Sequence, residues 1–195
     1  MINTEAKIAK ILLETSAIKL SPEKPFKWSS GWNSPIYCDN RTVLSYSHHR
    51  KAIKEMLSAK IAAEFEGVDT IIGVATAGIA MGALVADELS LSYAYCRPEP
   101  KSHGLKRQLE GKVDKDAKIV VLEDLISTGG SSLKVVEYLR AEGYNVMGMA
   151  AIFTYGFQIA DDNFNHADCK YITLGNYASM IDEAVTSGYV QESDL

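Results

Sequence analysis

The stretch KIVVLEDLISTGGSS, residues 118–132, decides the fold of this chain. Its apolar run, residues 119–122, is rich in β-branched residues and shows no polar alternation, which predicts a strand buried on both faces. Two adjacent carboxylates, Glu123 and Asp124, end that strand. The Ser/Thr/Gly segment that follows leads into a helix predicted over residues 131–141. A buried strand that passes through a polar loop into a helix is typical of a parallel α/β sheet.

The same alternation of strands and helices continues on both sides of this stretch. Strands are predicted over residues 70–75, 92–96, 145–154 and 171–174, and further helices over residues 79–89 and 177–185. Strands without polar alternation, separated by helices, indicate a parallel sheet that is covered on both faces. Because crossovers between parallel strands are right-handed, we predict a doubly wound, mainly parallel α/β sheet with helices on both faces.

The N-terminal part of the chain has a different pattern. Apolar residues at helical spacing predict a short helix over residues 4–19. Residues 26–39 indicate two short strand-like pieces around a Ser/Gly/Asn turn, and residues 47–67 a second helix with a serine N-cap and a closing glycine. We therefore expect a single domain, with a small N-terminal hood over about residues 1–45 and a core over about residues 46–175.

Composition excludes several classes of protein. The chain has 195 residues, of which 47% are hydrophobic and 23% charged, values that suit one globular domain rather than a disordered chain. Its net charge of −5 argues against a nucleic-acid partner. Cys38, Cys96 and Cys169 form no C-x-x-C pair, so we expect neither a disulfide framework nor a zinc site, and a cytoplasmic location. No signal peptide or membrane helix is expected, and hence no membrane partner.

The segment around the acidic pair has the chemistry of a ligand site. In open α/β sheets ligands bind beyond the carboxyl ends of the strands, where Glu123 and Asp124 are expected. Acceptor-only carboxylates suit a ligand with neighbouring donors, such as the 2- and 3-hydroxyls of a ribose. Small residues over 127–131 let backbone N–H groups gather at a helix start, where a phosphate is stabilised. The competing interpretation is a solvated strand end followed by a capped turn.

The string EDLISTGGSS, residues 123–132, resembles the phosphoribosyl-diphosphate-binding motif of the type I phosphoribosyltransferases. In the same way GVATAGI, residues 73–79, resembles the diphosphate-side loop of that family. Neither G-x-x-x-x-G-K-[ST] nor G-x-G-x-x-G occurs in the chain. The resemblance implies that phosphoribosyl diphosphate is bound by Thr76, Ala77, Arg97, Lys101, His103, Glu123, Asp124, Leu125, Ile126, Ser127, Thr128, Gly129, Gly130 and Ser131.

A basic loop over residues 97–112 interrupts the α/β pattern. It carries five Lys or Arg against two Glu, within a chain whose net charge is −5. The string Arg97-x-x-x-Lys101-x-His103-Gly104 looks like the catalytic loop of the orotate phosphoribosyltransferase family. This resemblance implies that Lys101 meets the departing diphosphate, with Arg97 and His103 assisting, and that the loop closes over the neighbouring subunit of a homodimer. The competing interpretation is a solvated connection.

Two further segments resemble the same family and indicate a site for the base. Residues 29–37, SSGWNSPIY, resemble the orotate-facing strand and turn, and residues 153–156, FTYG, follow a predicted strand at the same edge of the sheet. The residues implied to bind orotate are Ser30, Tyr37, Ser127 and Tyr155.

The chain also departs from the family pattern. Some members carry lysines at the positions held here by Ser29, Ala77 and Pro98, and an arginine at the position of Tyr155. The missing lysines leave more of the charge neutralisation to the basic loop and a bound metal. The base-carboxylate contact usually assigned to that arginine has no obvious donor in this sequence.

The resemblance implies a magnesium-dependent transfer of ribose 5-phosphate from phosphoribosyl diphosphate to N1 of orotate, which yields orotidine 5-monophosphate and diphosphate in pyrimidine synthesis. Lys101, His103, Glu123 and Asp124 are the implied catalytic residues. Magnesium is expected to bind through ligand oxygens and water, without a direct protein ligand. Two alternatives share the ribose motif: a purine or uracil phosphoribosyltransferase, and a regulator that senses a nucleotide without turnover.

Overall fold

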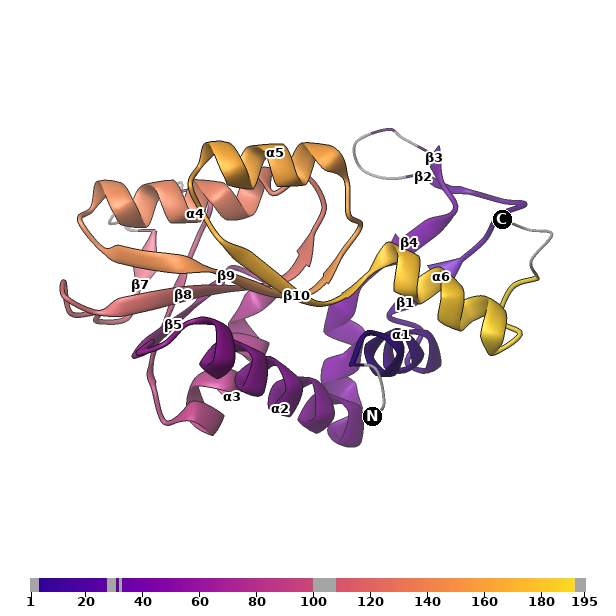
Figure 1. Ribbon diagram of the computed structural model, residues 1–195, viewed down its shortest axis with the longest axis horizontal. Helices are drawn as coiled ribbons and strands as arrows, with labels where there is room; N and C mark the ends of the chain where they lie inside the picture. Colours follow the sequence, from indigo (N-terminus) through magenta and orange to yellow (C-terminus); the bar gives the residue numbers. More distant parts are fainter. Residues whose placement is uncertain (1–3, 28–30, 32, 100–107, 192–195) are drawn as a thin grey trace.

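A six-stranded sheet forms the centre of the computed structural model, which describes residues 4–27, 31, 33–99 and 108–191 (Figure 1). The strand order is β10-β9-β8-β5-β6-β7, and only β7 runs antiparallel to its neighbour. The strands are β5 (Thr70–Val74), β6 (Ser92–Cys96), β7 (Leu109–Glu110), β8 (Lys118–Ile126), β9 (Asn145–Thr154) and β10 (Tyr171–Asn176). The predicted mainly parallel α/β sheet is confirmed.

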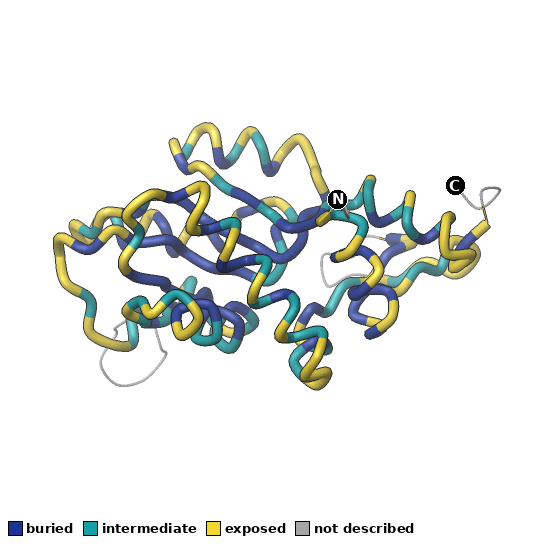
Figure 2. Tube along the Cα trace, turned by 60° about the horizontal axis from the view of Figure 1, so that its bottom comes forward, coloured by how far each residue is buried: buried dark blue, intermediate teal, exposed yellow. Residues whose placement is uncertain are grey.

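Helices cover both faces of this sheet. Helices α2 (Ser47–Glu64) and α3 (Gly78–Leu89) lie on one face, and α4 (Gly130–Ala141) and α5 (Gln158–His166) lie on the other (Figure 1). Successive side chains of a strand point to opposite faces. Ile71 therefore joins the apolar cluster under α2 and α3, whereas Ile72 joins the cluster under α4 and α5. Strand β5 is consequently buried from end to end, and β8 and β9 are buried over most of their length (Figure 2).

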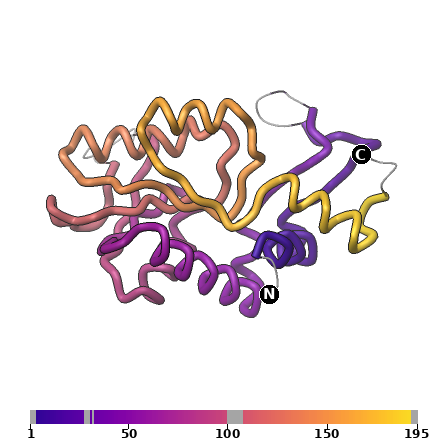
Figure 3. Tube along the Cα trace, in the orientation of Figure 1, coloured from indigo at the N-terminus to yellow at the C-terminus, as the bar shows by residue number. Residues whose placement is uncertain are grey.

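The N-terminal segment lies beside the sheet rather than on it. It contains α1 (Thr4–Glu14), β1 (Ile18–Leu20), β2 (Phe26–Lys27), β3 (Asn33–Ser34), β4 (Ile36–Cys38) and the 3-10 helix η1 (Asn40–Ser45). Strand β1 pairs antiparallel with β4, and β2 with β3. The C-terminal helix α6 (Tyr177–Thr186) packs against α1, so the indigo and yellow parts of the chain meet (Figure 3). Buried Ile8 and Leu12 of α1 share one apolar cluster with Met180 of α6.

The predicted helix over residues 4–19 is wrong in its second half. Helix α1 ends at Glu14, and the side chain of Thr15 donates to the carbonyl of Ile11 at 2.8 Å. Ser16 then adopts a left-handed conformation with φ of 55°, which turns the chain into β1. Apolar spacing continued past Glu14 because Ile18 is buried in a strand instead of a helix.

Three short elements were not predicted. Helix α5 buries only Ala160 and Phe164 among polar neighbours, so its apolar stripe is narrow. The other two, η1 and β7, lie within segments expected to be irregular. Among the helices that the structure describes, none combines the length and the apolarity needed to cross a bilayer.

Candidate active site

The acidic pair lies inside β8 rather than at its end. The strand was expected to end at Glu123, but it continues to Ile126 because β9 pairs with it as far as Ile126 and Thr154. On its other side, β8 pairs with β5 only as far as Leu122. Glu123 and Asp124 thus begin where the β5 edge of β8 loses its partner strand, at the carboxyl end of the sheet.

Each carboxylate of the pair has a distinct environment. The Glu123 side chain is buried, and its two oxygens accept from the backbone N–H of Asp124 at 2.9 Å and from the Ser132 hydroxyl at 3.2 Å. Asp124 is half-buried. Ser132 stands one turn into α4, so this helix and the strand before it fix the Glu123 carboxyl jointly.

The protonation of the pair is governed by its burial. Desolvation raises the pKa of Glu123 to about 9, helped by the neighbouring Asp124 carboxyl, which shares a hydrogen bond with it. Desolvation also raises the pKa of Asp124, although the hydrogen bond from Glu123 opposes that rise. Ionising two adjacent carboxyl groups costs free energy when both are poorly solvated, because the two negative charges repel each other. The ligand-free pair therefore takes up a proton at a higher pH than two separate, solvated carboxylates would.

A side chain of α5 contacts the predicted phosphate loop, residues 127–131. Asn163 donates from its side-chain nitrogen to the carbonyl of Thr128 at 2.9 Å. Gly129 has a φ of 79°, and its carbonyl accepts from the backbone N–H of Leu133 at 2.8 Å, which begins α4. Backbone N–H groups at the first turn of a helix form a site for an anion.

Other members of the predicted site have well-defined places around this loop. Thr128, Gly130 and Ser131 are exposed at the start of α4, and Ser127 and Leu125 are half-buried. Ile126 is fully buried in the core, and its carbonyl accepts from the Thr154 hydroxyl and the Tyr155 N–H. The Ile126 side chain therefore points into the core, and only the Ile126 backbone lies near the predicted phosphate loop.

Gly129 should tolerate no side chain. A Cβ there would come within 2.6 Å of the Phe164 ring, in a conformation that L residues rarely adopt, whereas a Cβ on Gly130 would meet nothing closer than 3.7 Å. We expect Gly129→Ala to lower the free energy of unfolding by on the order of 1–3 kcal/mol and to weaken phosphoribosyl-diphosphate binding. The matched control, Gly130→Ala, should keep the stability. Urea unfolding of both variants checks this, and equal stability would contradict it.

The loop between β5 and α3 lies against the acidic strand. A Cβ on Gly78 would come within 2.4 Å of the Leu122 carbonyl, so glycine alone lets α3 start this close to β8. This approach brings Gly78, the first residue of α3, against Leu122 and Glu123, and Thr76 and Ala77 directly precede it in the chain. Thr76 is exposed and Ala77 half-buried, and the peptide bond between Ala75 and Thr76 is cis. The two predicted diphosphate-side residues are therefore next to the predicted ribose site.

Aromatic side chains of the N-terminal segment and of β9 converge near Asp124. Tyr155 is buried, and burial raises its pKa, as do the nearby charges of Cys38, Asp124 and Tyr37. Tyr37 is 43% exposed, so it can still meet a ligand. Its ring lies 5.8 Å from that of Phe26. The structure thus brings two of the predicted base-binding residues together, while Ser30 and Ser29 lie outside the described residues.

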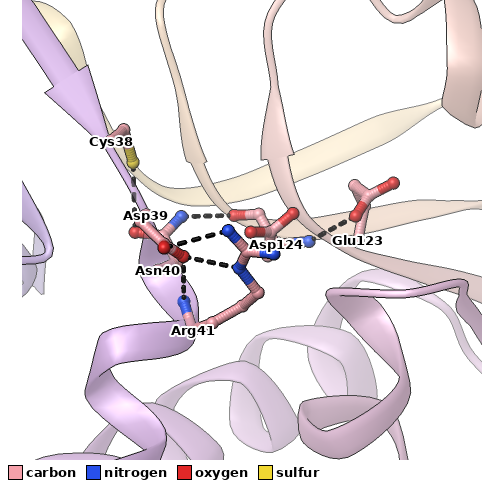
Figure 4. A network of polar contacts seen from close by, with 6 residues as sticks. All are labelled: Cys38, Asp39, Asn40, Arg41, Glu123 and Asp124. Carbon is pink, nitrogen blue, oxygen red and sulfur yellow. Dashed lines mark hydrogen bonds and ion pairs between the residues drawn. The ribbon is translucent and has the colours of Figure 1, made fainter.

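A polar segment that the sequence did not single out links β4 to the acidic pair (Figure 4). Asn40 is buried, and its side chain donates to the backbone carbonyl of Asp124 at 2.8 Å and accepts from the Cys38 thiol at 3.3 Å. Asp39 accepts from Nε of Arg41 at 2.6 Å and from its Nη2 at 2.9 Å. The available signal was the run of three polar residues directly after the strand-like 36–38 segment.

The described ends of the basic loop are anchored beside the phosphate loop. Gln108 donates from its side chain to the carbonyls of Arg97 and Pro98, at 2.9 and 3.2 Å, and so closes the base of the loop. Glu99 pairs with Lys134 of α4 at 3.2 Å. Lys101 and His103 lie outside the described residues. The anchoring points nevertheless direct the start of the loop over α4, the helix that begins at the phosphate loop.

The acidic pair bears on how the site would hold a divalent cation. Within the described ranges, no group of three or more His, Cys, Asp or Glu side chains is placed to ligate a metal. Mg²⁺ commonly uses one or two carboxylates and takes its other ligands from substrate oxygens and water. Both oxygens of Glu123 already accept hydrogen bonds, so the site suits a cation that is held by substrate oxygens and water, as predicted from the sequence.

Comparisons with known proteins agree with this geometry. Residues 43–187 match the family described as phosphoribosyl transferase domain. The chain is 52% identical over 194 residues to the orotate phosphoribosyltransferase of Cytophaga hutchinsonii, covering all of this chain and 93% of that protein. It is 49% identical to that of Bacteroides thetaiotaomicron, covering all of the chain and 92% of the relative.

A solved structure shares the whole fold. The crystal structure of orotate phosphoribosyltransferase from Aeropyrum pernix is similar with a TM-score of 0.81 and 28% sequence identity. The match covers 94% of this chain and 99% of that one.

Proposed function

The chain belongs to the orotate phosphoribosyltransferase family, and from this membership we propose how its residues bind and activate the two substrates. The protein is an orotate phosphoribosyltransferase, a pentosyltransferase of pyrimidine biosynthesis. It transfers ribose 5-phosphate from phosphoribosyl diphosphate to N1 of orotate, releasing diphosphate and orotidine 5-monophosphate. The observation that carries the residue assignments is the acidic pair at the open edge of β8, next to the phosphate loop.

Glu123 and Asp124 accept hydrogen bonds from the 2- and 3-hydroxyls of the ribose. The hydrogen bonds inside the site support this proposal. The Ser132 hydroxyl and the backbone N–H of Asp124 both donate to Glu123, so the Glu123 carboxyl is oriented before the ligand binds. The 5-phosphate lies on the amides and hydroxyls of residues 127–131, at the positive end of α4. The diphosphate extends toward Thr76 and Ala77, which directly precede Gly78, the residue that lies against Glu123.

Orotate stacks and hydrogen-bonds on the other side of the ribose, between Tyr37, Tyr155, Ser127 and Ser30. The electrostatic contact of Tyr155 with both Tyr37 and Asp124 supports a base site next to the sugar site. In that position N1 of the base faces C1 of the ribose. Placement of the two reacting atoms is a large part of catalysis for such a transfer.

Bond breaking at C1 leaves an oxocarbenium-like sugar and a departing diphosphate. The negative charge that Asp124 carries once the ribose is bound stabilises the positive sugar, and Glu123 keeps it oriented. Lys101, assisted by Arg97 and His103, stabilises the negative charge that grows on the diphosphate. Mg²⁺ would be held by substrate oxygens and water, without a direct protein ligand, and when bound it would supply positive charge beside the diphosphate.

The enzyme acts as a homodimer in which the basic loop of one subunit covers the site of the other, with residues 1–45 as a hood over the base. The support for this proposal is the position of the described ends of that loop, where Gln108 donates to the carbonyls of Arg97 and Pro98 and Glu99 pairs with Lys134 of α4. A cytoplasmic location accords with the free thiols of Cys38, Cys96 and Cys169.

Asp124→Asn tests the assignment of the acidic pair. The change keeps the shape of the side chain but removes a charge-assisted interaction worth about 1.5–3 kcal/mol, so kcat should fall by at least about ten-fold. The exposed Asp116 lies at the other end of β8, so Asp116→Asn is a matched control that should retain the wild-type rate. The measurement is diphosphate release with phosphoribosyl diphosphate, magnesium and orotate, with hypoxanthine and uracil as alternative bases. Wild-type kinetics in Asp124→Asn would show that the acidic pair has no role in the reaction and is only part of a strand.

A further inference from the structure

The carboxylate of orotate requires a partner that the site described so far lacks. It is attached to C6 of the ring, next to the N1 that forms the new bond, so it enters the site close to the ribose and to Asp124. This inference rests on the proposed function. A carboxylate there would be repelled by Asp124 unless a cation stood nearby, and the expected position for an arginine is occupied by Tyr155.

Arg41 is a cation on the correct side of the site. It follows Asn40, whose side chain is bonded to the Asp124 backbone at 2.8 Å, so the first residues of η1 are fixed against the acidic strand. Figure 4 shows its guanidinium turned back toward that strand. The charge of Arg41 lowers the pKa of Asp124, and it also interacts with Tyr37. Arg41 is therefore within electrostatic reach of a sugar residue and a base residue.

The guanidinium has one edge in use and one edge available. Asp39 accepts from Nε and Nη2, at 2.6 and 2.9 Å, and also caps the start of η1 by accepting from the Arg41 backbone N–H. An arginine has five donors, and a carboxylate can bind two of them in parallel. Within the described part of the chain, Nη1 of Arg41 donates no hydrogen bond, and the Arg41 side chain is 58% exposed. The edge formed by Nη1 and Nη2 therefore keeps donors that are not used within the described part of the chain.

We propose that Arg41 is a specificity-determining residue that binds the carboxylate of orotate through Nη1 and Nη2, while Asp39 holds its opposite edge. This bidentate contact would select a pyrimidine that carries a carboxylate next to N1 over uracil, which has none. Asp39 fixes the plane of the Arg41 guanidinium, so less side-chain entropy is lost when the carboxylate binds.

Product binding tests this contact separately from turnover. Orotidine 5-monophosphate and uridine 5-monophosphate differ only in the carboxylate, and their dissociation constants can be measured by calorimetry on the full-length protein. We expect wild type to prefer orotidine 5-monophosphate. Arg41→Gln should raise the dissociation constant of orotidine 5-monophosphate by about 10- to 100-fold, the range of a charge-assisted bidentate contact. It should leave the dissociation constant of uridine 5-monophosphate unchanged. Arg41→Lys keeps the charge without the fork and should restore part of the preference.

The control variant removes a similar exposed cation elsewhere. Lys10 pairs with nearby Glu14 at 3.9 Å on α1, so Lys10→Gln deletes one positive charge without touching the site and should leave both affinities unchanged. The proposal is overturned if Arg41→Gln retains the preference, if wild type has none, or if both ligands weaken equally, which would indicate a purely structural role. Orotate-dependent diphosphate release by wild type is measured in parallel. Its absence would instead overturn the proposed function.

Discussion

Lys101→Ala should lower kcat by about 100- to 1000-fold, the loss typical of a donor that acts on charge developed in the transition state. If Lys101 meets the diphosphate as the C1 bond breaks, its interaction grows along the reaction. Such an interaction appears in kcat rather than in the affinity for orotate. Steady-state kinetics combined with an orotate binding measurement separates these two effects.

The control for this variant lies in the same loop. Lys106→Ala removes an equal charge from the basic loop but falls outside the Arg97-x-x-x-Lys101-x-His103-Gly104 string, so its kcat should stay near the wild-type value. Equal losses in both variants would assign the effect to the general charge of the loop. A near-normal kcat in Lys101→Ala would show that the loop is a solvated connection.

Mixing Lys101→Ala chains with Asp124→Asn chains, each impaired on its own, should restore activity. In a symmetric dimer with shared sites, random re-association places half of the chains in hybrids, and each hybrid has one site with both residues intact. The mixture should therefore reach about a quarter of the wild-type activity, above the activity of either variant alone. The rate of diphosphate release before and after dissociation and re-association measures the recovery.

Two outcomes of this experiment contradict the shared site. Subunits that re-associate as dimers, shown by light scattering, but stay inactive would place the loop over its own subunit. A chain that remains monomeric at assay concentration and is fully active would remove the dimer from the mechanism altogether.

The positions in the fold of the candidate ribose and phosphate residues could be predicted because these residues are contiguous in sequence. Glu123, Asp124 and the following loop occupy one strand, one turn and one helix start, and their order alone places them at the carboxyl edge of the sheet. The strand was predicted to end too early, because pairing of β8 with β9 prolongs it and no single segment reveals the length of its neighbour.

The contacts of Asn40 and Arg41 could not be predicted in the same way. Asn40 meets Asp124 across 84 positions of sequence, and only the folded chain brings η1 to the end of β8. The error in the first helix has a similar cause. Ile18 is apolar because β1 is buried, and the apolar spacing alone did not distinguish that strand from another turn of helix.

The raised pKa of the buried acidic pair would link the proposed substrate binding to proton release. If the ribose hydroxyls donate to the ionised carboxylates, as proposed, they lower the pKa of Glu123, which burial raises to about 9 in the ligand-free site. A ligand that favours the deprotonated form expels the proton and binds more tightly as the pH rises toward that value. The heat of binding should then depend on the ionisation enthalpy of the buffer. Ser132 and the backbone of Asp124, which hold Glu123 in place, thereby help to set how the enzyme responds to the pH of its surroundings.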